Sequence, residues 1–315
     1  MPRMDAVTLK QLRALKAVAE AGSMTAAGAA LGLTTPAIHS QIKGLEAAVG
    51  RGLLTRGGEG GGFVPTAEGV AMLKAAERVD AVLSQVTEEL RALGAGRSGL
   101  VRLGTVSTAK YFAPRLVRML NDACPEVEVR LQDGNREAVI ADLDRGALDL
   151  AVMGRPPRAP LVEAVPLGPH PHGIVLPPGH RLAGKEGFDP AALMQEVFLS
   201  REPGSGTRIL MERFLDRLAE GDPVQRIEMT SNETIKQAVM AGLGVAFLSL
   251  HTVCDELAAG RLVLLRGPGL PVMRHWYLVT PADHPPSAAA RRVAEVIVAL
   301  NGTYLPKPPP GQVPA

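Results

Sequence analysis

The chain has 315 residues, of which 46% are hydrophobic and 21% charged, and its formal net charge is only +2. This composition is typical of a globular protein with two or three domains and excludes a polycation. The N-terminal residues carry charges throughout, and no run of about 18 apolar residues occurs, so we expect neither a secretory signal nor a membrane span. Cys124 and Cys254 have no metal-type spacing and form no disulfide framework, which favours a reduced, cytoplasmic protein.

The first 65 residues contain three helical patterns followed by a glycine-rich hairpin pattern. Apolar residues recur at helical spacing over 8–21, and a run of small residues predicts a short second helix over 25–32. A third helix follows, for which Thr34 or Thr35 is the expected cap. The segment 51–66 is too rich in glycine for a helix and predicts a hairpin. This order of elements is that of a winged helix-turn-helix domain.

The third helix combines an apolar stripe with polar positions that include no carboxylate at its start or along one face. In a winged helix-turn-helix domain this helix lies in the DNA major groove, where phosphates would repel acidic groups. The predicted DNA contacts on this helix are Thr34, Thr35, Pro36, His39, Ser40 and Lys43, and those of the hairpin are Arg51 and Arg56. The alternative is an ordinary helical domain with a solvated polar face, because residues 1–65 contain only seven Lys and Arg against four Asp and Glu.

Residues 66–95 predict one long linker helix with an incomplete apolar seam. The seam residues are Val70, Leu73, Val82, Val86, Leu90 and Leu93. Because a long helix that leaves a small domain needs a partner to bury such a seam, we predict that it dimerises. The alternative is a helix packed on its own chain. The glycine-rich segment 94–99 then breaks the helix and marks a domain boundary.

Residues 96–305 alternate between strand and helix patterns, which predicts an α/β domain of two lobes with a mostly parallel sheet. We expect the chain to cross between the lobes near 165–170 and to return near 268–275. Lobe I then comprises about 100–168 and 272–303, lobe II comprises about 169–271, and residues 306–315 form a disordered tail.

Such lobes bind small molecules in the cleft beyond the strand ends. The loops expected there carry hydroxyl, amide and basic groups near helix N-termini, where free N–H groups and the helix dipole favour anions. We therefore predict an acidic or phosphorylated effector. The candidate residues are Ser107, Thr108, Lys110, Asn135, Arg136, Gly154, Arg155, Arg201, Ser205, Gly206, Thr207, Arg208, Asn232 and Glu233. The alternative is that each Ser, Thr or Asn only caps its helix.

Catalytic motifs such as GxSxG, HExxH or a defensible pair of carboxylates are missing from the sequence, so we expect neither an enzyme nor a cofactor. The motif PHPHG at 169–173 could offer two histidines to a metal, but the run continues as a strand and we predict no metal site. Cys124 and Cys254 are expected to be buried thiols rather than a redox pair.

Several motifs resemble those of LysR-type transcriptional regulators. SMTAAGAALGLTTPAIHSQIKGLEAAVG, LLTR and TAEG occur in the order found in that family, and the resemblance extends over nearly the whole chain. The segments STAKYFAPRLVRML, LQDGNREAVIADLDRGALDLAVMGRPPR and SREPGSGTR are similar to the CbbR-type regulators of Calvin–Benson–Bassham operons. The resemblance implies an effector domain of two lobes similar to those of periplasmic binding proteins, and control of CO2-fixation genes.

The resemblance also implies the partners of the protein. They are double-stranded promoter DNA and a small anionic effector such as ribulose 1,5-bisphosphate, a related phosphorylated metabolite or NADPH. The family's assembly implies a homodimer that forms a homotetramer through pairing of linker helices, and RNA polymerase is a further candidate partner. The alternatives are a LysR-type regulator of another operon with a carboxylate effector, and a solute-binding protein.

Overall fold

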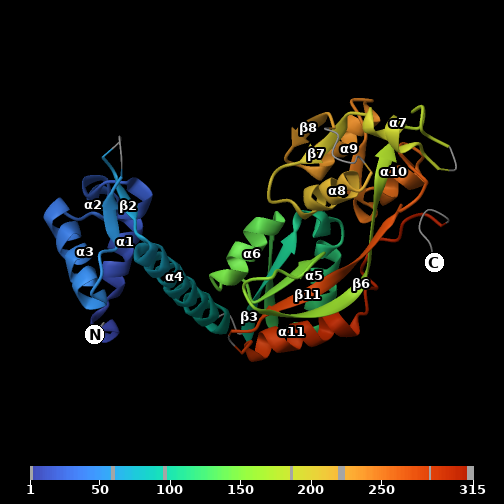
Figure 1. Cartoon of the computed structure of the whole chain (residues 1–315). Coiled ribbons are helices and arrows are strands. Elements are labelled where there is room, and N and C mark those ends of the chain that lie inside the picture. The colour runs from blue at the N-terminus through green and yellow to red at the C-terminus, as the bar shows by residue number, and fades with distance from the viewer. Residues whose placement is uncertain are drawn as a thin grey trace. The chain divides into compact units, whose positions relative to one another are not determined.

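The computed structural model describes residues 3–57, 61–94, 98–184, 187–218, 224–283 and 285–310, without the side chains of residues 88, 89, 92 and 93. The chain divides into two compact units, Met1–Thr87 and Glu88–Ala315 (Figure 1). Within the described residues, no helix is both long and apolar enough to cross a membrane.

The first unit contains the predicted helices and hairpin. Its elements are the 3₁₀ helix η1 (Met4–Ala6), α1 (Leu9–Ala21), α2 (Met24–Leu31), α3 (Thr35–Val49), β1 (Leu54–Arg56), β2 (Phe63–Pro65) and most of α4 (Ala67–Gly94). The side chains of Thr8, Ser23 and Thr34 cap α1, α2 and α3. The strands β1 and β2 pair antiparallel, which confirms the predicted hairpin, while its tip at 58–60 lies outside the described residues.

Small residues in α2 allow a close turn into α3. A Cβ built on Gly28 would lie 2.6 Å from the carbonyl oxygen of Leu33, and the backbone N–H of Leu33 donates to the Gly28 carbonyl at 2.9 Å. Gly32 has a φ of +65°, a left-handed conformation that favours glycine. The three helices enclose a core that includes Leu15, Ile38 and other aliphatic side chains.

The helix α4 leaves most of its apolar seam exposed. Val70, Val82, Val86 and Leu90 are between 46% and 64% exposed, whereas Leu73 packs on the core of the first unit. The exposed residues agree with a need for a partner, and dimerisation stays a prediction. The expected break at 94–99 falls partly on residues 95–97, outside the described residues.

The second unit is built on a seven-stranded sheet with helices on its faces (Figure 1). The strands of that sheet are β3 (Gly99–Val106), β4 (Val127–Gly134), β5 (Leu150–Met153), β6 (Val162–Leu176), β9 (Ala246–Ser249), β10 (Val263–Leu264) and β11 (Val272–Pro281), and β7 (Phe198–Arg201) pairs with β8 (Arg226–Met229) separately. The helices are η2 (Ser107–Tyr111), α5 (Ala113–Ala123), α6 (Arg136–Asp144), α7 (Pro190–Met194), α8 (Gly206–Asp216), α9 (Asn232–Met240), η3 (Leu250–Thr252), α10 (Cys254–Ala258) and α11 (Ala288–Ala299).

The long strands β6 and β11 cross between two lobes, close to the predicted crossing points. We call the end of this unit that carries α5, α6 and α11 lobe I, and the end that carries α7 to α10 lobe II (Figure 1). The expectation of a mostly parallel sheet is wrong. The strand β3 is parallel to β4 and β5, but β11 is antiparallel to both β5 and β6, and β6 is antiparallel to β9 and β10. The reason is that β6 leads the chain into lobe II and β11 brings it back, so the two must run in opposite directions.

The strand β6 begins at Val162, before the strand that the sequence predicts after the PHPHG motif. Its N-terminal part contains Pro166, Pro169 and Pro171, which argue against a strand because proline has no N–H to donate. Over these residues, however, β6 pairs on one side only, with β11, so the N–H groups that the prolines lack are not all needed. The sequence patterns also did not predict the short elements α7, α10 and β10.

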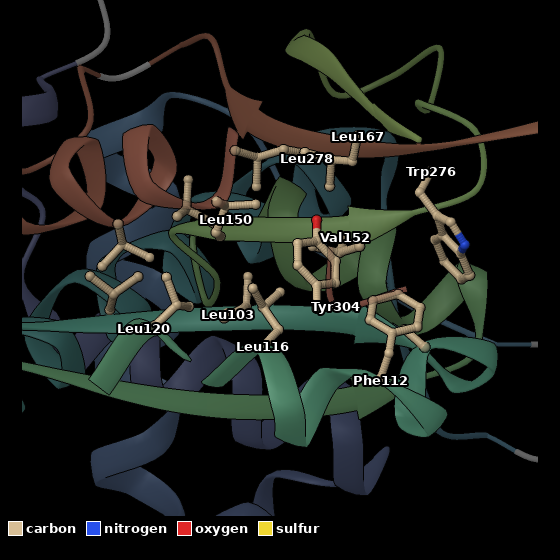
Figure 2. Close-up of a cluster of buried hydrophobic side chains, with 14 of the residues drawn as sticks. Leu103, Phe112, Leu116, Leu120, Leu150, Val152, Leu167, Trp276, Leu278 and Tyr304 are labelled. Atoms are coloured by element: carbon tan, nitrogen blue, oxygen red, sulfur yellow. The ribbon is translucent and has the colours of Figure 1, made fainter. Parts of the chain in front are cut away.

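The core of lobe I contains three large aromatic residues, Phe112, Trp276 and Tyr304. Phe112 meets the ring of Trp276 edge-on at a centroid distance of 4.9 Å and lies 5.6 Å from the ring of Tyr304 (Figure 2). Leu103, Leu150 and other aliphatic residues from the sheet and from α5 and α11 complete this core (Figure 2). The described tail residues 306–310 form no helix or strand, and 311–315 lie outside the described residues.

Candidate DNA interface and ligand cleft

The helix α3 presents polar groups on the side opposite its core residues. Ile38 and Leu45 are fully buried, whereas the predicted DNA contacts Thr34, Thr35, Pro36, His39, Ser40 and Lys43 are all exposed. The hydroxyl of Thr34 accepts a hydrogen bond from the N–H of Ala37 at 3.4 Å, so Thr34 rather than Thr35 caps the helix. The hydroxyl of Thr35 instead donates to that of Thr25 in α2, at 3.4 Å.

The basic side chains of this unit differ in whether a carboxylate already pairs with them. The Lys43 ammonium lies 3.0 Å from a carboxylate oxygen of Glu46. Burial alone would raise the pKa of Glu46, but hydrogen bonds from the Leu53 N–H and from Lys43 lower it overall. Lys43 must therefore leave or share this carboxylate to contact a phosphate. Arg51 and Arg56 are exposed, and the Arg56 guanidinium lies 5.7 Å from the ring centre of Phe63 on the facing strand.

A cavity of about 820 Å³ lies between the lobes of the second unit, bordered by both lobes and by the crossing strands. Eight of the predicted effector residues line it: Ser107, Thr108, Arg136, Gly154, Arg155, Ser205, Gly206 and Thr207. The helix α8 begins at this cavity, and the side chain of its N-cap residue, Ser205, makes no capping hydrogen bond. The positive end of the α8 dipole therefore faces the cavity, and the Ser205 hydroxyl is not used to cap the helix.

The cavity lining is basic. Among the described residues it includes Arg136, Arg155, Arg158, Arg213 and Arg274, and no Asp or Glu. Burial, together with repulsion from neighbouring guanidinium groups, lowers the pKa of Arg136, whose guanidinium donates to two backbone carbonyls, those of residues 155 and 156. None of the five arginines forms an ion pair with a carboxylate among the described residues. Such an uncompensated positive charge in a cleft attracts small anions.

Family models account for both units. The model of the "Bacterial regulatory helix-turn-helix protein, lysR family" matches residues 9–70, and that of the "LysR substrate binding domain" matches residues 94–301. The chain belongs to the LysR family of transcriptional regulators. The resemblance inferred from its motifs is thereby confirmed, as is the class of fold: a helix-turn-helix domain joined to an α/β effector domain.

Relatives of this LysR-family regulator are similar over most of their length. It is 59% identical to the HTH-type transcriptional regulator CbbR of Cereibacter sphaeroides, over 98% of this chain and all of the relative. It is 39% identical to the RuBisCO operon transcriptional regulator of Allochromatium vinosum, over 87% of this chain and 89% of the relative. Among solved structures, the regulatory domain of Synechocystis CcmR in complex with 2-PG is 32% identical with a TM-score of 0.61, covering 65% of this chain and 98% of that domain.

The other predicted effector residues of the regulator do not line the cavity. Lys110 is exposed beside the ring of Tyr111, and Asn135 caps α6 by accepting from the N–H of Ala138 at 2.9 Å. The guanidinium of Arg208 pairs with Glu212 at 3.0 Å and with Glu228 at 2.6 Å. For Asn135, therefore, the alternative of simple helix capping describes what the structure shows.

Arg201 and Glu233 contact lobe I instead of facing the cavity, and Asn232 holds the guanidinium of Arg201. The buried guanidinium of Arg201 donates to Asn232 at 2.8 Å and, across the lobes, to the hydroxyl of Ser107 at 3.2 Å. The Tyr111 hydroxyl of lobe I donates to the carboxylate of Glu233 in lobe II. Because Ser107 also lines the cavity, a ligand that contacts Ser107 would act on a residue that takes part in this lobe contact. Direct contact of Arg201, Asn232 and Glu233 with an effector stays a prediction.

Sequence reasoning missed the cavity residues on the crossing strands and two further arginines. The missed lining residues with polar side chains are His170, His172, Arg274, His275 and Tyr277 on β6 and β11, Arg158 before β6, and Arg213 on α8. In the register of β6 and β11, Arg274 lies opposite His170 and Val272 opposite His172. The PHPHG motif was the available signal, but it was weighed only as a metal site. Among the described residues, no group of three or more His, Cys, Asp or Glu side chains could hold a metal ion.

Proposed function

We propose that this regulator controls CO2-fixation genes by binding promoter DNA, and that a phosphorylated effector in the cleft between its lobes governs that control. The observation that carries the effector assignment is the cavity, which five arginines and no carboxylate line in the described part of the chain. The names of the relatives, CbbR and RuBisCO operon transcriptional regulator, support the target genes. The proposed role requires no catalysis and places the protein with the chromosome, in the cytoplasm.

The size and charge of the cavity favour a phosphate-bearing metabolite. Its volume of about 820 Å³ lies within the range of small-molecule sites. The paired N–H groups of an arginine guanidinium match the oxygens of a phosphate in geometry and charge. The similar CcmR domain was solved in complex with 2-PG, which supports an anionic effector here as well. Ribulose 1,5-bisphosphate, a related phosphorylated metabolite and NADPH are the candidates.

In the proposed DNA complex, α3 enters the major groove of a half-site. Thr34, Thr35, Pro36, His39 and Ser40 would lie near base edges, because they are exposed at the N-terminal part of the helix. Lys43, Arg51 and Arg56 would contact phosphates and set the position of the domain. Dimers formed through the exposed seam of α4 would assemble into tetramers, and RNA polymerase is a further partner in this proposal.

The effector would act by shifting the equilibrium between two arrangements of the lobes. It can do so only if its affinity for the two arrangements differs. The contact between Arg201 and Ser107 supports such a difference, because Ser107 borders both the cavity and the lobe contact. A changed lobe arrangement in each subunit would then change the spacing of the DNA-binding domains on the promoter.

Fluorescence anisotropy on a labelled CO2-fixation promoter fragment tests both parts of the proposal. Tight binding relative to scrambled duplex, altered by ribulose 1,5-bisphosphate, is the expected result. We expect Arg213→Ala to weaken the affinity for the sugar phosphate, read from its effect on DNA binding, about 10- to 100-fold, because a hydrogen bond to a charged group is lost. Arg118→Ala, on the exposed surface of α5, is the matched control and should leave it unchanged.

Each unexpected result has a distinct meaning. Selective DNA binding that responds to a dicarboxylate but to no phosphate would replace the effector with a carboxylate, and no preference for the promoter would point to another operon. A protein that binds small anions but no DNA fragment at all would behave as a solute-binding protein, and the proposal would be abandoned.

A further inference from the structure

Three buried histidines surround the single tryptophan beside the effector cavity. His170 stacks on Trp276 with ring centroids 3.8 Å apart and an interplanar angle of 14°, and the rings of His170 and His172 are 4.1 Å apart. His251 lies in η3, with its ring centre 5.7 Å from that of His170. All three are at most 3% exposed, yet His170 and His172 also line the cavity. We call these two residues the histidine wall.

Hydrogen bonds determine which ring nitrogens carry protons. Nδ1 of His172 lies 3.0 Å from the carbonyl oxygen of His170, and a carbonyl only accepts, so this nitrogen is protonated. The indole N–H of Trp276 donates to Nδ1 of His251 at 3.0 Å, so that nitrogen is not protonated. Burial lowers the pKa of His172 to about 3 and that of His251 to about 4. At neutral pH the rings are uncharged, and Nε2 of His172 has a free lone pair.

The histidine wall contains polar atoms for which the protein supplies no partner. Nδ1 of His170 is shielded from solvent and makes no hydrogen bond, while Nε2 of the same ring lies 2.9 Å from the hydroxyl of Ser249. No hydrogen bond to Nε2 of His172 occurs among the described residues. Gly154, another lining residue, lies on the Nδ1 side of His170, since a Cβ built on it would be 2.9 Å from that atom. Nδ1 of His170 is a buried polar atom, and such atoms normally have a partner. Nε2 of His172 belongs to a residue that lines the cavity, so both atoms are left to a ligand.

The chemistry of the free atoms selects the ligand group. An ionised phosphate or carboxylate oxygen only accepts hydrogen bonds, so it cannot pair with the lone pair on Nε2 of His172. A hydroxyl donates to that nitrogen, and because it can also accept, it satisfies Nδ1 of His170 in either tautomer. The arginines of the same cavity bind the charged end of a ligand.

We propose that the histidine wall binds a hydroxyl group of the effector, so that the effector is a phosphate ester carrying free hydroxyls rather than a phosphate with only a carboxylate. This inference rests on the proposed phosphorylated effector and adds the second recognition element. The arginines supply affinity for the anion, and His170 and His172 supply selectivity among anions.

A matched pair of probes separates these two elements. Ribitol 1,5-bisphosphate and pentane-1,5-diol bisphosphate have the same span and charge, but only the first carries hydroxyls. In isothermal titration with the full-length protein, we expect the ribitol compound to bind about tenfold more tightly, the effect of one or two neutral hydrogen bonds. His172→Phe should remove this preference and leave the affinity for the pentanediol compound within about twofold, since no charged contact changes.

Two further variants distinguish the loss of a hydrogen bond from a general disturbance of the structure. His172→Gln keeps a polar group near the position of Nε2 and should restore part of the preference. His180→Phe, at a histidine that does not line the cavity, is the matched control and should keep the whole preference. If His172→Phe does not fold, as judged by Trp276 fluorescence, Gly154→Ala replaces it. The added methyl group crowds His170 and should lower the affinity for the ribitol compound more than for the pentanediol compound.

The outcomes distinguish this inference from the proposed function. If the wild-type protein binds neither bisphosphate, the phosphorylated effector itself fails. If it binds both equally, or if a folded His172→Phe protein loses both equally, the anion site stands and hydroxyl recognition by the histidine wall is overturned.

Discussion

The buried histidines around Trp276 make the stability of the effector domain depend on pH. Burial lowers the pKa of His170, His172 and His251 below the ordinary value of 6.5, to about 3 for His172 and about 4 for His251. Arg274 on β11 adds repulsion against a charge on His172. Between pH 6.5 and 4, the unfolded chain therefore binds protons that the folded domain does not bind. The free energy of unfolding must then fall as the pH falls through this range.

The magnitude follows from the pKa of the unfolded histidines. At pH 5.5 a histidine with an unfolded pKa of 6.5 that stays neutral in the folded state lowers the free energy of unfolding by about 1.4 kcal/mol relative to pH 7.5. Three such histidines lower it by about 4 kcal/mol, a large part of the stability of a typical domain. Carboxylates contribute little here, because their ordinary pKa lies below this range.

Urea denaturation at pH 7.5, 6.5 and 5.5 measures this effect, with the fluorescence of Trp276 as the signal. Trp276 is the single tryptophan of the chain and stacks on His170, so it reports on the effector domain alone. His251→Asn keeps an acceptor for the indole N–H but removes a titrating group, and should reduce the pH effect by about 1.4 kcal/mol. His275→Gln, at an exposed position, should not change it. A wild-type difference below about 1 kcal/mol between pH 7.5 and 5.5 would refute the reasoning.

Three further predictions concern DNA binding and packing. Lys43→Ala should weaken binding to every DNA sequence and reduce the slope of log affinity against log salt by about one, measured by anisotropy, and an unchanged slope would remove Lys43 from the interface. Gly69→Ala would place a Cβ 2.0 Å from the carbonyl oxygen of Leu53, and should lower the stability of the first unit by about 1–3 kcal/mol in circular dichroism melts; an unchanged melt would contradict this contact. Phe112→Ala should cost about 3–5 kcal/mol in urea denaturation, because the ring is 1% exposed, and a loss under about 1 kcal/mol would show that the core of lobe I rearranges freely.

Features that depend on neighbouring residues in the chain could be predicted from the sequence. The stripe of Ile38 and Ile42, the cap at Thr34 and the turn at Gly32 act within a few residues, so their patterns predicted α3 and its exposed face. The loops after predicted strands likewise indicated Arg136, Arg155 and the start of α8, because the ends of parallel strands meet at one edge of a sheet.

The sequence could not show which charged groups pair with each other. Arg201 and Glu233 have the residue types of an anion site, but Arg201 donates to Asn232 and Ser107, and Glu233 accepts from Tyr111. These partners come from separate segments of the chain, and a loop pattern contains no information about them. For the same reason, the predicted role of both residues in effector binding is still open.

What the sequence determined by itself was the order of most helices and strands, the family and the presence of basic groups in the loops around the cleft. The tertiary structure alone decided how the cleft selects among anions. His170 and His172 lie on β6, and Arg274 lies on β11, about 100 residues later in the chain. Alternation along each strand predicts which side chains share a face, but only the antiparallel register of the two strands brings these residues together at one cavity. That register is set by long-range pairing and by the packing of both lobes, which no local pattern contains.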